Sequence, residues 1–178
     1  MFDFNYNPAS FPVFNEFGAI VSWWLMIRVE NRSRDSPSDS PYPYGGPSAF
    51  AVAQIISETQ IAPVASDSVV FGDFSHDVED PRIVYNAAEK RYYMTYTRSD
   101  ANCSSSLALA CARLSIASTH DPRAADGWSD HGAVFGDVAG FQWTKSGAIM
   151  LGDAPSALHY MIWANWCSFD PWVSPLYM

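Results

Sequence analysis

The sequence predicts an all-β fold built from antiparallel hairpins. Aromatic residues make up 15% of the 178-residue chain, and aromatic side chains favour strands. Twelve prolines and ten glycines punctuate the chain at short intervals, which is typical of a fold with many turns. No long stretch carries the period of 3.6 residues that marks an amphipathic helix. With 48% hydrophobic residues, the chain has enough apolar material for one packed domain.

Nine strand-like runs follow one another between turn clusters. They cover residues 19–29, 49–56, 68–71, 82–86, 91–97, 107–116, 132–135, 146–151 and 158–165. The long polar segment 31–47 is expected to be an exposed loop that joins two antiparallel strands, and residues 87–89 are expected to form a tight hairpin. Such hairpins permit a sandwich, a barrel or a propeller. A faint repeat in units of roughly 40 to 60 residues favours propeller blades.

Charge and composition exclude several classes of partner. The formal net charge is −9, so the chain lacks the basic surface that nucleic acids or anionic membranes require. The apolar run 17–27 is shorter than the roughly 20 residues that cross a bilayer, and it is interpreted as a buried strand. No signal peptide is visible, which favours a cytoplasmic location. Cys103, Cys111 and Cys167 lack metal-ligand spacing, so we expect buried thiols and no metal site.

The segment with most chemical content is Glu79, Asp80, Pro81 and Arg82. Pro81 fixes its own φ and biases Asp80 toward an extended backbone. Because side chains alternate along a strand, Asp80 and Arg82 are expected to share one face while Glu79 points to the other. A structural ion pair and a sugar-cleaving carboxylate explain this pattern equally well from local physics alone.

Residues 78–100 (VEDPRIVYNAAEKRYYMTYTRSD) resemble the signature of glycoside hydrolase family 130, the β-mannoside phosphorylases and mannosidases. Shorter matches occur elsewhere in the chain, in the family's order, at 7–9 (NPA), 25–31 (LMIRVEN), 107–110 (LALA) and 145–149 (KSGAI). The resemblance implies a five-bladed β-propeller with its sugar site at the central axis. Because such propellers need about 300 residues, residues 1–178 are expected to form a single partial propeller domain of about three blades.

The resemblance also implies roles for individual residues. Asp80 matches the proposed general acid, which protonates the departing glycosidic oxygen. Arg28 and Arg82 match arginines that bind sugar hydroxyls or orient the acid. The remaining expected substrate-binding residues are Asn7, Glu79 and Lys145. An oligosaccharide is the implied partner, no cofactor is implied, and inorganic phosphate is a possible co-substrate.

Two departures from the family pattern bear on the reaction. The strand-like run 158–165 has no arginine where the phosphorylases carry a phosphate-binding basic residue, and Asp77 replaces a glycine. Asp77 is expected either to raise the pKa of Asp80 or to lie in solvent. Inverting phosphorolysis and inverting hydrolysis therefore both stay open. The alternative is a propeller fragment that binds carbohydrate without cleaving it.

Overall fold

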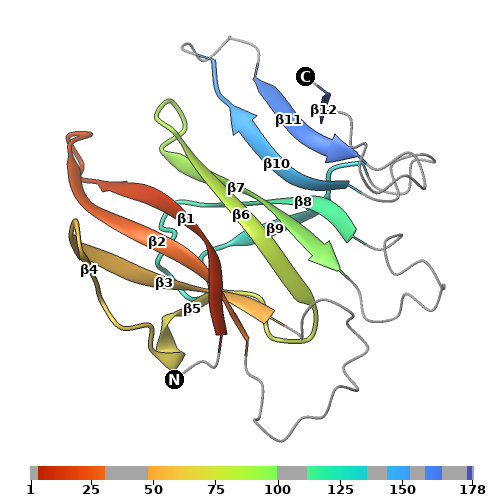
Figure 1. Cartoon of the computed structure of the whole chain (residues 1–178). Coiled ribbons are helices and arrows are strands. Elements are labelled where there is room, and N and C mark those ends of the chain that lie inside the picture. The colour runs from red at the N-terminus through yellow and green to blue at the C-terminus, as the bar shows by residue number, and fades with distance from the viewer. Residues whose placement is uncertain are drawn as a thin grey trace, which may run out of the picture.

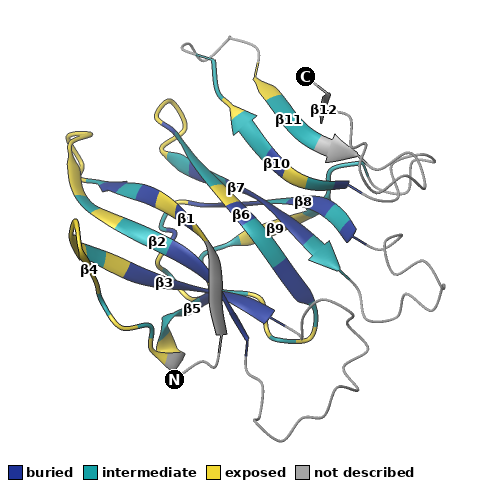
Figure 2. Cartoon of the chain, viewed as in Figure 1, coloured by how far each residue is buried: buried dark blue, intermediate teal, exposed yellow. Residues whose placement is uncertain are grey.

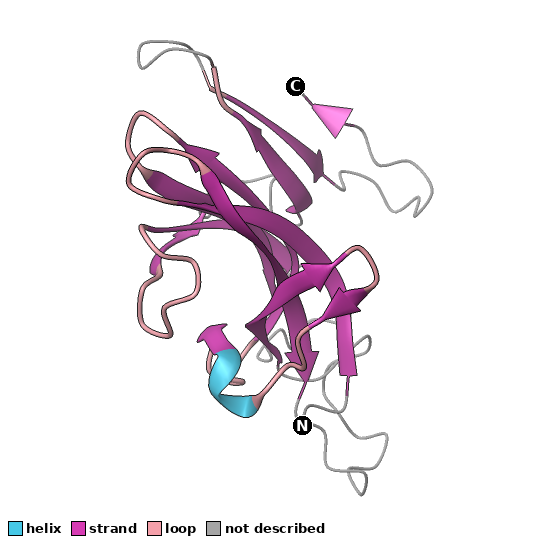
Figure 3. Ribbon diagram, turned by 90° about the vertical axis from the view of Figure 1, so that its left-hand side faces the viewer, coloured by secondary structure: helices cyan, strands magenta, loops and turns pink. Residues whose placement is uncertain are grey.

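The computed structural model describes residues 4–30, 48–99, 112–135, 144–152, 159–165 and 176–177, and almost all of them lie in strands or turns (Figure 1). The strands are β1 (Phe4–Phe14), β2 (Ile20–Glu30), β3 (Ser48–Ser57), β4 (Gln60–Ile61), β5 (Val69–Phe71), β6 (Asp77–Asn86), β7 (Arg91–Ser99), β8 (Ala112–Thr119), β9 (Ser129–Ala133), β10 (Thr144–Met150), β11 (Tyr160–Asn165) and β12 (Leu176–Tyr177). One short 3₁₀ turn, Ser66–Ser68, precedes β5 and stands out in Figure 3. Within the described ranges, no helix is long and apolar enough to cross a membrane.

The strands form three antiparallel sheets in chain order. Sheet A has the order β1-β2-β3-β4, with β5 also pairing with β3, whereas sheet B has the order β6-β7-β8-β9 and sheet C the order β10-β11-β12. Each sheet is therefore a meander whose first strand lies at one edge. Hairpins join β1 to β2, β6 to β7 and β10 to β11, and each pair is antiparallel.

The first strands of the three sheets lie next to one another. β6 packs against β1 on one side and against β10 on the other (Figure 1). We call β1, β6 and β10 the inner strands. Successive meanders whose first strands meet in this way have the arrangement of propeller blades. The prediction of an all-β, propeller-type fold with about three blades is confirmed.

The main hydrophobic core lies between sheets A and B. Its largest buried side chains include Phe11, Phe50, Met94 and Tyr96. The rings of Phe50 and Tyr96 meet edge to face with centroids 6.2 Å apart, a geometry that aromatic pairs prefer. Figure 2 shows the buried residues where β2, β3 and β6 converge, whereas the hairpin tips at 15–18, 57–60 and 87–90 are exposed.

Most predicted strands coincide with observed ones, but the first strand was missed. β1 contains Pro8 and Pro12, and prolines inside a run argue against a strand. β1 tolerates them because it is an edge strand and because Pro8 lies in a bulge. The prediction that 17–27 is a buried strand is wrong for its first half, where Phe17 is 86% exposed in a turn before β2. The predicted loop 31–47 and the three cysteines lie outside the described residues.

Each inner strand carries a β-bulge at the corresponding place. In β1, Asn7 and Pro8 together oppose one residue of β2. The same two-against-one pairing occurs at Asp80 and Pro81 in β6 and at Ser146 and Gly147 in β10. Bulges bend a strand and redirect its side chains. The three sheets thus repeat one irregular feature where the inner strands meet.

Replacing Gly147 by alanine is expected to destabilise the protein by about 1–3 kcal/mol, the usual cost of overpacking a core. An added Cβ would lie 2.6 Å from Cδ1 and 3.1 Å from Cγ of the buried Leu114. Urea unfolding of Gly147→Ala checks the loss. The loss should shrink in a Leu114→Ala background, since the two residues are in contact; equal losses in both backgrounds would contradict the steric explanation.

Candidate functional site

A cavity of about 360 Å³ lies among the inner strands, directly beside the three bulges. β1, β6 and β10 all line it, and the residue that follows each bulge (Ala9, Arg82 and Ala148) is part of its wall. We call it the axial cavity. Arg82 is the charged residue of this wall. It is exposed, and its Nη1 donates a hydrogen bond to the carbonyl oxygen of Pro81 at 2.7 Å.

Asp80 occupies the first position of the bulge in β6 with a left-handed backbone, φ 54°. The prediction that Pro81 keeps Asp80 extended is therefore wrong, because the bulge overrides the local preference. Ser146, the first residue of the bulge in β10, is also left-handed at φ 53°. Its Oγ donates to Oδ2 of Asp80 at 3.3 Å. Two residues in a costly backbone conformation thus meet across sheets B and C.

A buried arginine organises the carboxylates near this bulge. Arg28 on β2 is 3% exposed. Its Nη2 lies 3.0 Å from Oε1 of Glu30 and 2.6 Å from Oδ1 of Asp77, and its Nη1 lies 3.4 Å from Oε2 of Glu79. Buried charges need such partners because their desolvation is costly. Three carboxylates therefore share one guanidinium, and they connect sheet A to the start of β6.

Glu79 also connects to sheet C. Its Oε1 forms an ion pair with Nζ of Lys145 on β10, so one carboxylate joins all three sheets. Glu79 and Asp80 both contact β10, and the prediction that they point to opposite faces is wrong. The reason is the bulge between Glu79 and Arg82, which interrupts the strict alternation of side chains.

Asp77 is buried, not solvated as one prediction allowed. Its Oδ1 accepts from Arg28 and lies 2.7 Å from Oγ of Ser48, which also accepts the backbone N–H of Val78 at 2.8 Å. Burial raises the pKa of Asp77; Arg28 and Ser48 oppose this rise, while Glu79 and Glu30 add to it. Burial outweighs the opposing effects, so the charged form of Asp77 is held less favourably than that of an exposed aspartate.

Replacing Asp77 by asparagine is expected to remove part of the pH dependence of stability. The pKa of Asp77 is raised in the folded state. The contribution of this shift to folding stability is therefore fully present below the unfolded pKa of about 3.9, and it is lost as the pH rises through the folded pKa. Both polar contacts of Asp77 go to Oδ1, which the asparagine carbonyl can replace. Urea unfolding across pH should show that the free energy of unfolding of the variant increases relative to that of the wild type as the pH rises. A difference that stays constant with pH would contradict this.

The structure brings together four of the residues predicted from sequence, Arg28, Glu79, Asp80 and Lys145. Arg82 lies beside them at the axial cavity. Asn7 occupies the bulge of β1, and its side chain lies outside the described part. Sequence reasoning missed Glu30, Ser48 and Ser146. Glu30 and Ser48 sit on strands that reach the site only through long-range pairing, so no local pattern identifies them.

Across the described ranges, no group of histidine, cysteine and carboxylate side chains could hold a metal ion. The site therefore combines a carboxylate on a strained backbone, a neighbouring network of ion pairs and an exposed guanidinium beside a cavity.

Comparisons with known proteins give similar solved structures but no family. No family model matches the chain, and no curated protein matches it. Among solved structures, the chain is similar to an exo-β-1,3-galactanase from Phanerochaete chrysosporium, a glycoside hydrolase solved with β-1,3-galactotriose. The TM-score is 0.49 at 12% sequence identity, and the alignment covers 90% of this chain. The chain spans 37% of the length of the galactanase.

Proposed function

We propose that this protein cleaves glycosidic bonds of β-mannosides or related glycosides, with Asp80 as the general acid. The observation that carries the proposal is the position of Asp80 in a left-handed bulge at the meeting of the inner strands. Strained residues cluster at active sites because the surrounding structure must hold them in place. The resemblance of residues 78–100 to glycoside hydrolase family 130 assigns the same residue to the acid.

Asp80 suits proton transfer better than its neighbours do. Each oxygen of Glu79 is engaged by a cation, Arg28 or Lys145, and Asp77 is buried against Arg28. Asp80 is half-buried and accepts a hydrogen bond from the Ser146 hydroxyl. A general acid must lie within hydrogen-bond reach of the leaving oxygen. Asp80, which has a hydroxyl partner and precedes the cavity residue Arg82 by two positions in the same strand, is therefore our choice.

The axial cavity supports the proposal because it offers a place for the sugar. Arg82 supplies guanidinium donors at its wall, and these can bind sugar hydroxyls. Arg28 is buried and holds carboxylates, so its contribution is to orient Glu79 and, through Glu79, Lys145. Lys145 is partly exposed and completes the polar surroundings of Asp80.

The reaction breaks the bond between the anomeric carbon and the leaving oxygen, which takes the proton of Asp80. In the same step the anomeric carbon bonds to an oxygen of water or of phosphate on the opposite face. Water needs a base for its proton, whereas a phosphate anion needs cationic donors. β11 has no arginine or lysine, and the cations that we assign to phosphate are Lys145 on β10 and Arg82 at the axial cavity.

The test is to incubate the protein with β-1,4-mannobiose and with mannosyl-N-acetylglucosamine, each with and without inorganic phosphate. Release of mannose without phosphate indicates hydrolysis, and phosphate-dependent release of mannose 1-phosphate indicates phosphorolysis. Either product supports the proposal. A saccharide-induced rise in Tm without any product would overturn it in favour of a binding protein.

A further inference from the structure

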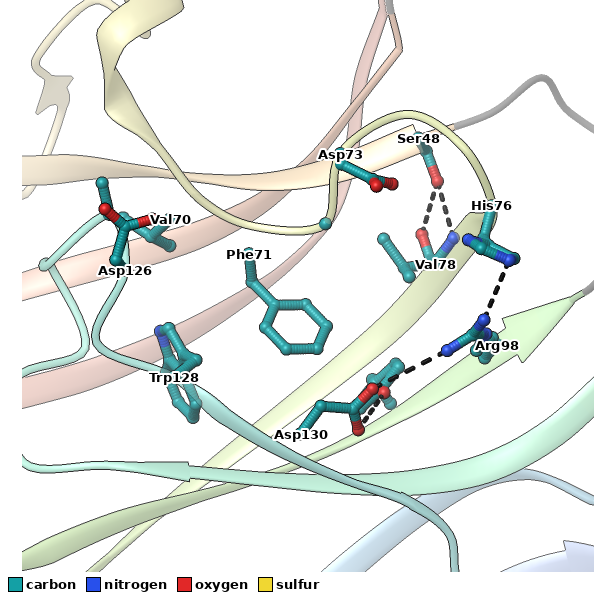
Figure 4. A pocket seen from close by; sticks show the side chains of 13 residues that line it. Ser48, Val70, Phe71, Asp73, His76, Val78, Arg98, Asp126, Trp128 and Asp130 are labelled. Carbon is teal, nitrogen blue, oxygen red and sulfur yellow. Dashed lines mark hydrogen bonds and ion pairs between the residues drawn. The ribbon is translucent and has the colours of Figure 1, made fainter.

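A second cavity, of about 470 Å³, lies between sheets A and B (Figure 4). We call it the intersheet cavity. Its walls come from β3, β5, β6, β7, β9 and the segments 72–76 and 125–128, and it shares no lining residue with the axial cavity. Its volume lies within the range of about 300–1,000 Å³ that is usual for small-molecule sites.

One wall of the intersheet cavity is aromatic. The ring of Phe71 lies 4.9 Å from that of Tyr96 and 6.3 Å from that of Trp128, edge to face in both cases. The indole N–H of Trp128 donates to the carbonyl oxygen of Pro122 at 3.3 Å, which fixes the orientation of the ring. Trp128 and Phe71 are both only partly buried. The aromatic wall is thus rigid and accessible from the cavity.

The opposite wall is a chain of hydrogen bonds. Nη2 of Arg98 lies 2.8 Å from Nε2 of His76. A guanidinium only donates, so Nε2 accepts and the proton of the imidazole sits on Nδ1, which lies 2.6 Å from Oγ of Ser75. The Ser75 hydroxyl in turn donates to Asp73. Each side chain along the wall is therefore held by its neighbour before any ligand arrives.

Asp130 joins the polar and aromatic walls. It accepts from the hydroxyl of Tyr96 at 2.7 Å and from the N–H of Gly132 at 2.9 Å, and its Oδ2 lies 3.7 Å from Nη1 of Arg98. Burial and the hydrogen bond to Asp130 raise the pKa of Tyr96, so this hydroxyl remains a donor. Such preorganisation lowers the entropic cost of binding.

The chemistry of the walls selects the ligand. Three carboxylates, from Asp73, Asp126 and Asp130, disfavour an anion, and an apolar ligand would leave charged groups desolvated. A sugar ring offers apolar C–H groups to the aromatic wall. Its hydroxyls both donate to carboxylates and accept from Arg98.

We propose that the intersheet cavity is a second saccharide-binding site, which takes a neutral mono- or disaccharide unit against Phe71 and Trp128 with hydroxyls on Asp126, Asp130 and Arg98. This site is independent of the proposed catalytic function, since Asp80 takes no part in it.

The test is a titration of tryptophan fluorescence with β-1,4-mannobiose, cellobiose and β-1,3-galactobiose. Asp126 is exposed and has no hydrogen-bond or ion-pair partner in the described part of the chain, so Asp126→Ala should leave the fold intact. We expect it to weaken binding roughly tenfold, the loss of one hydrogen bond to a charged group. Trp128→Phe should remove most of the fluorescence change.

Two controls separate this site from the axial one. Asp80→Asn should bind as the wild type does, and so should Glu58→Ala, which removes an exposed carboxylate in the turn after β3. The proposal is overturned if no saccharide binds, or if Asp80→Asn abolishes a binding event that Asp126→Ala and Trp128→Phe leave unchanged. Tight binding of spermidine that Asp126→Ala weakens, with no saccharide binding, would also overturn it, because the cavity would then be a cation site.

Discussion

Replacing Asp80 by asparagine is expected to lower kcat/KM on an unactivated disaccharide by about 10²–10⁴-fold, the usual contribution of a general acid. Asparagine keeps the size of the side chain and its oxygen can still accept from Ser146, but it cannot supply the proton. Asparagine tolerates the left-handed backbone at this position as well as aspartate does. Tm should therefore change little, and the loss is chemical, not structural.

The leaving group distinguishes an acid from a binding residue. An aryl mannoside with an acidic phenol needs little protonation, so Asp80→Asn should retain much more of its activity on that substrate than on mannobiose. Glu58→Gln provides the matched control, since it neutralises an exposed carboxylate far from the inner strands. Equal losses on both substrates would assign Asp80 to substrate binding, and unchanged activity on mannobiose would remove it from the mechanism.

The sequence pattern placed Asp80 at the start of a strand pair but misjudged its geometry. Strict alternation put Glu79 and Asp80 on opposite faces, whereas both contact β10. The missing element was the bulge, and a proline inside a strand is a marker of one. Pro8 and Pro81 carry this marker in β1 and β6, and Gly147 has the corresponding place in β10. The repeated feature was therefore present in the sequence as three polar residues, each followed by proline or glycine.

The ion pairs around Arg28 could not be predicted from local sequence patterns. Arg28 is separated from Asp77 and Glu79 by 49 and 51 residues, and their contact depends on how sheet A packs on β6. A lone arginine in a strand predicts a partner without saying which one. The strand pattern, in contrast, depends on composition and turns, and for this reason most strands could be predicted.

Replacing Arg28 by methionine is expected to lower the free energy of unfolding by about 3–5 kcal/mol at neutral pH, the cost of leaving buried charges without their partner. Methionine fills a similar length without charge. Arg123→Met is the control: Arg123 pairs with Asp121 at 2.8 Å, but both side chains are at least 40% exposed, and exposed pairs contribute only about 0–1 kcal/mol. Urea unfolding of both variants should separate these two magnitudes.

The pH dependence identifies the cause of the loss at Arg28. The guanidinium opposes the effect of burial on Asp77, so its removal raises the pKa of Asp77 in the folded protein further. A raised folded pKa means stability that is present at low pH and lost as the pH rises; the deficit of Arg28→Met should therefore shrink toward pH 4. Adding Asp77→Asn and Glu30→Gln should recover part of it at neutral pH. A deficit independent of pH, unrelieved by these changes, would mean that Arg28 stabilises the protein through packing and not as the shared counter-ion beside Asp80.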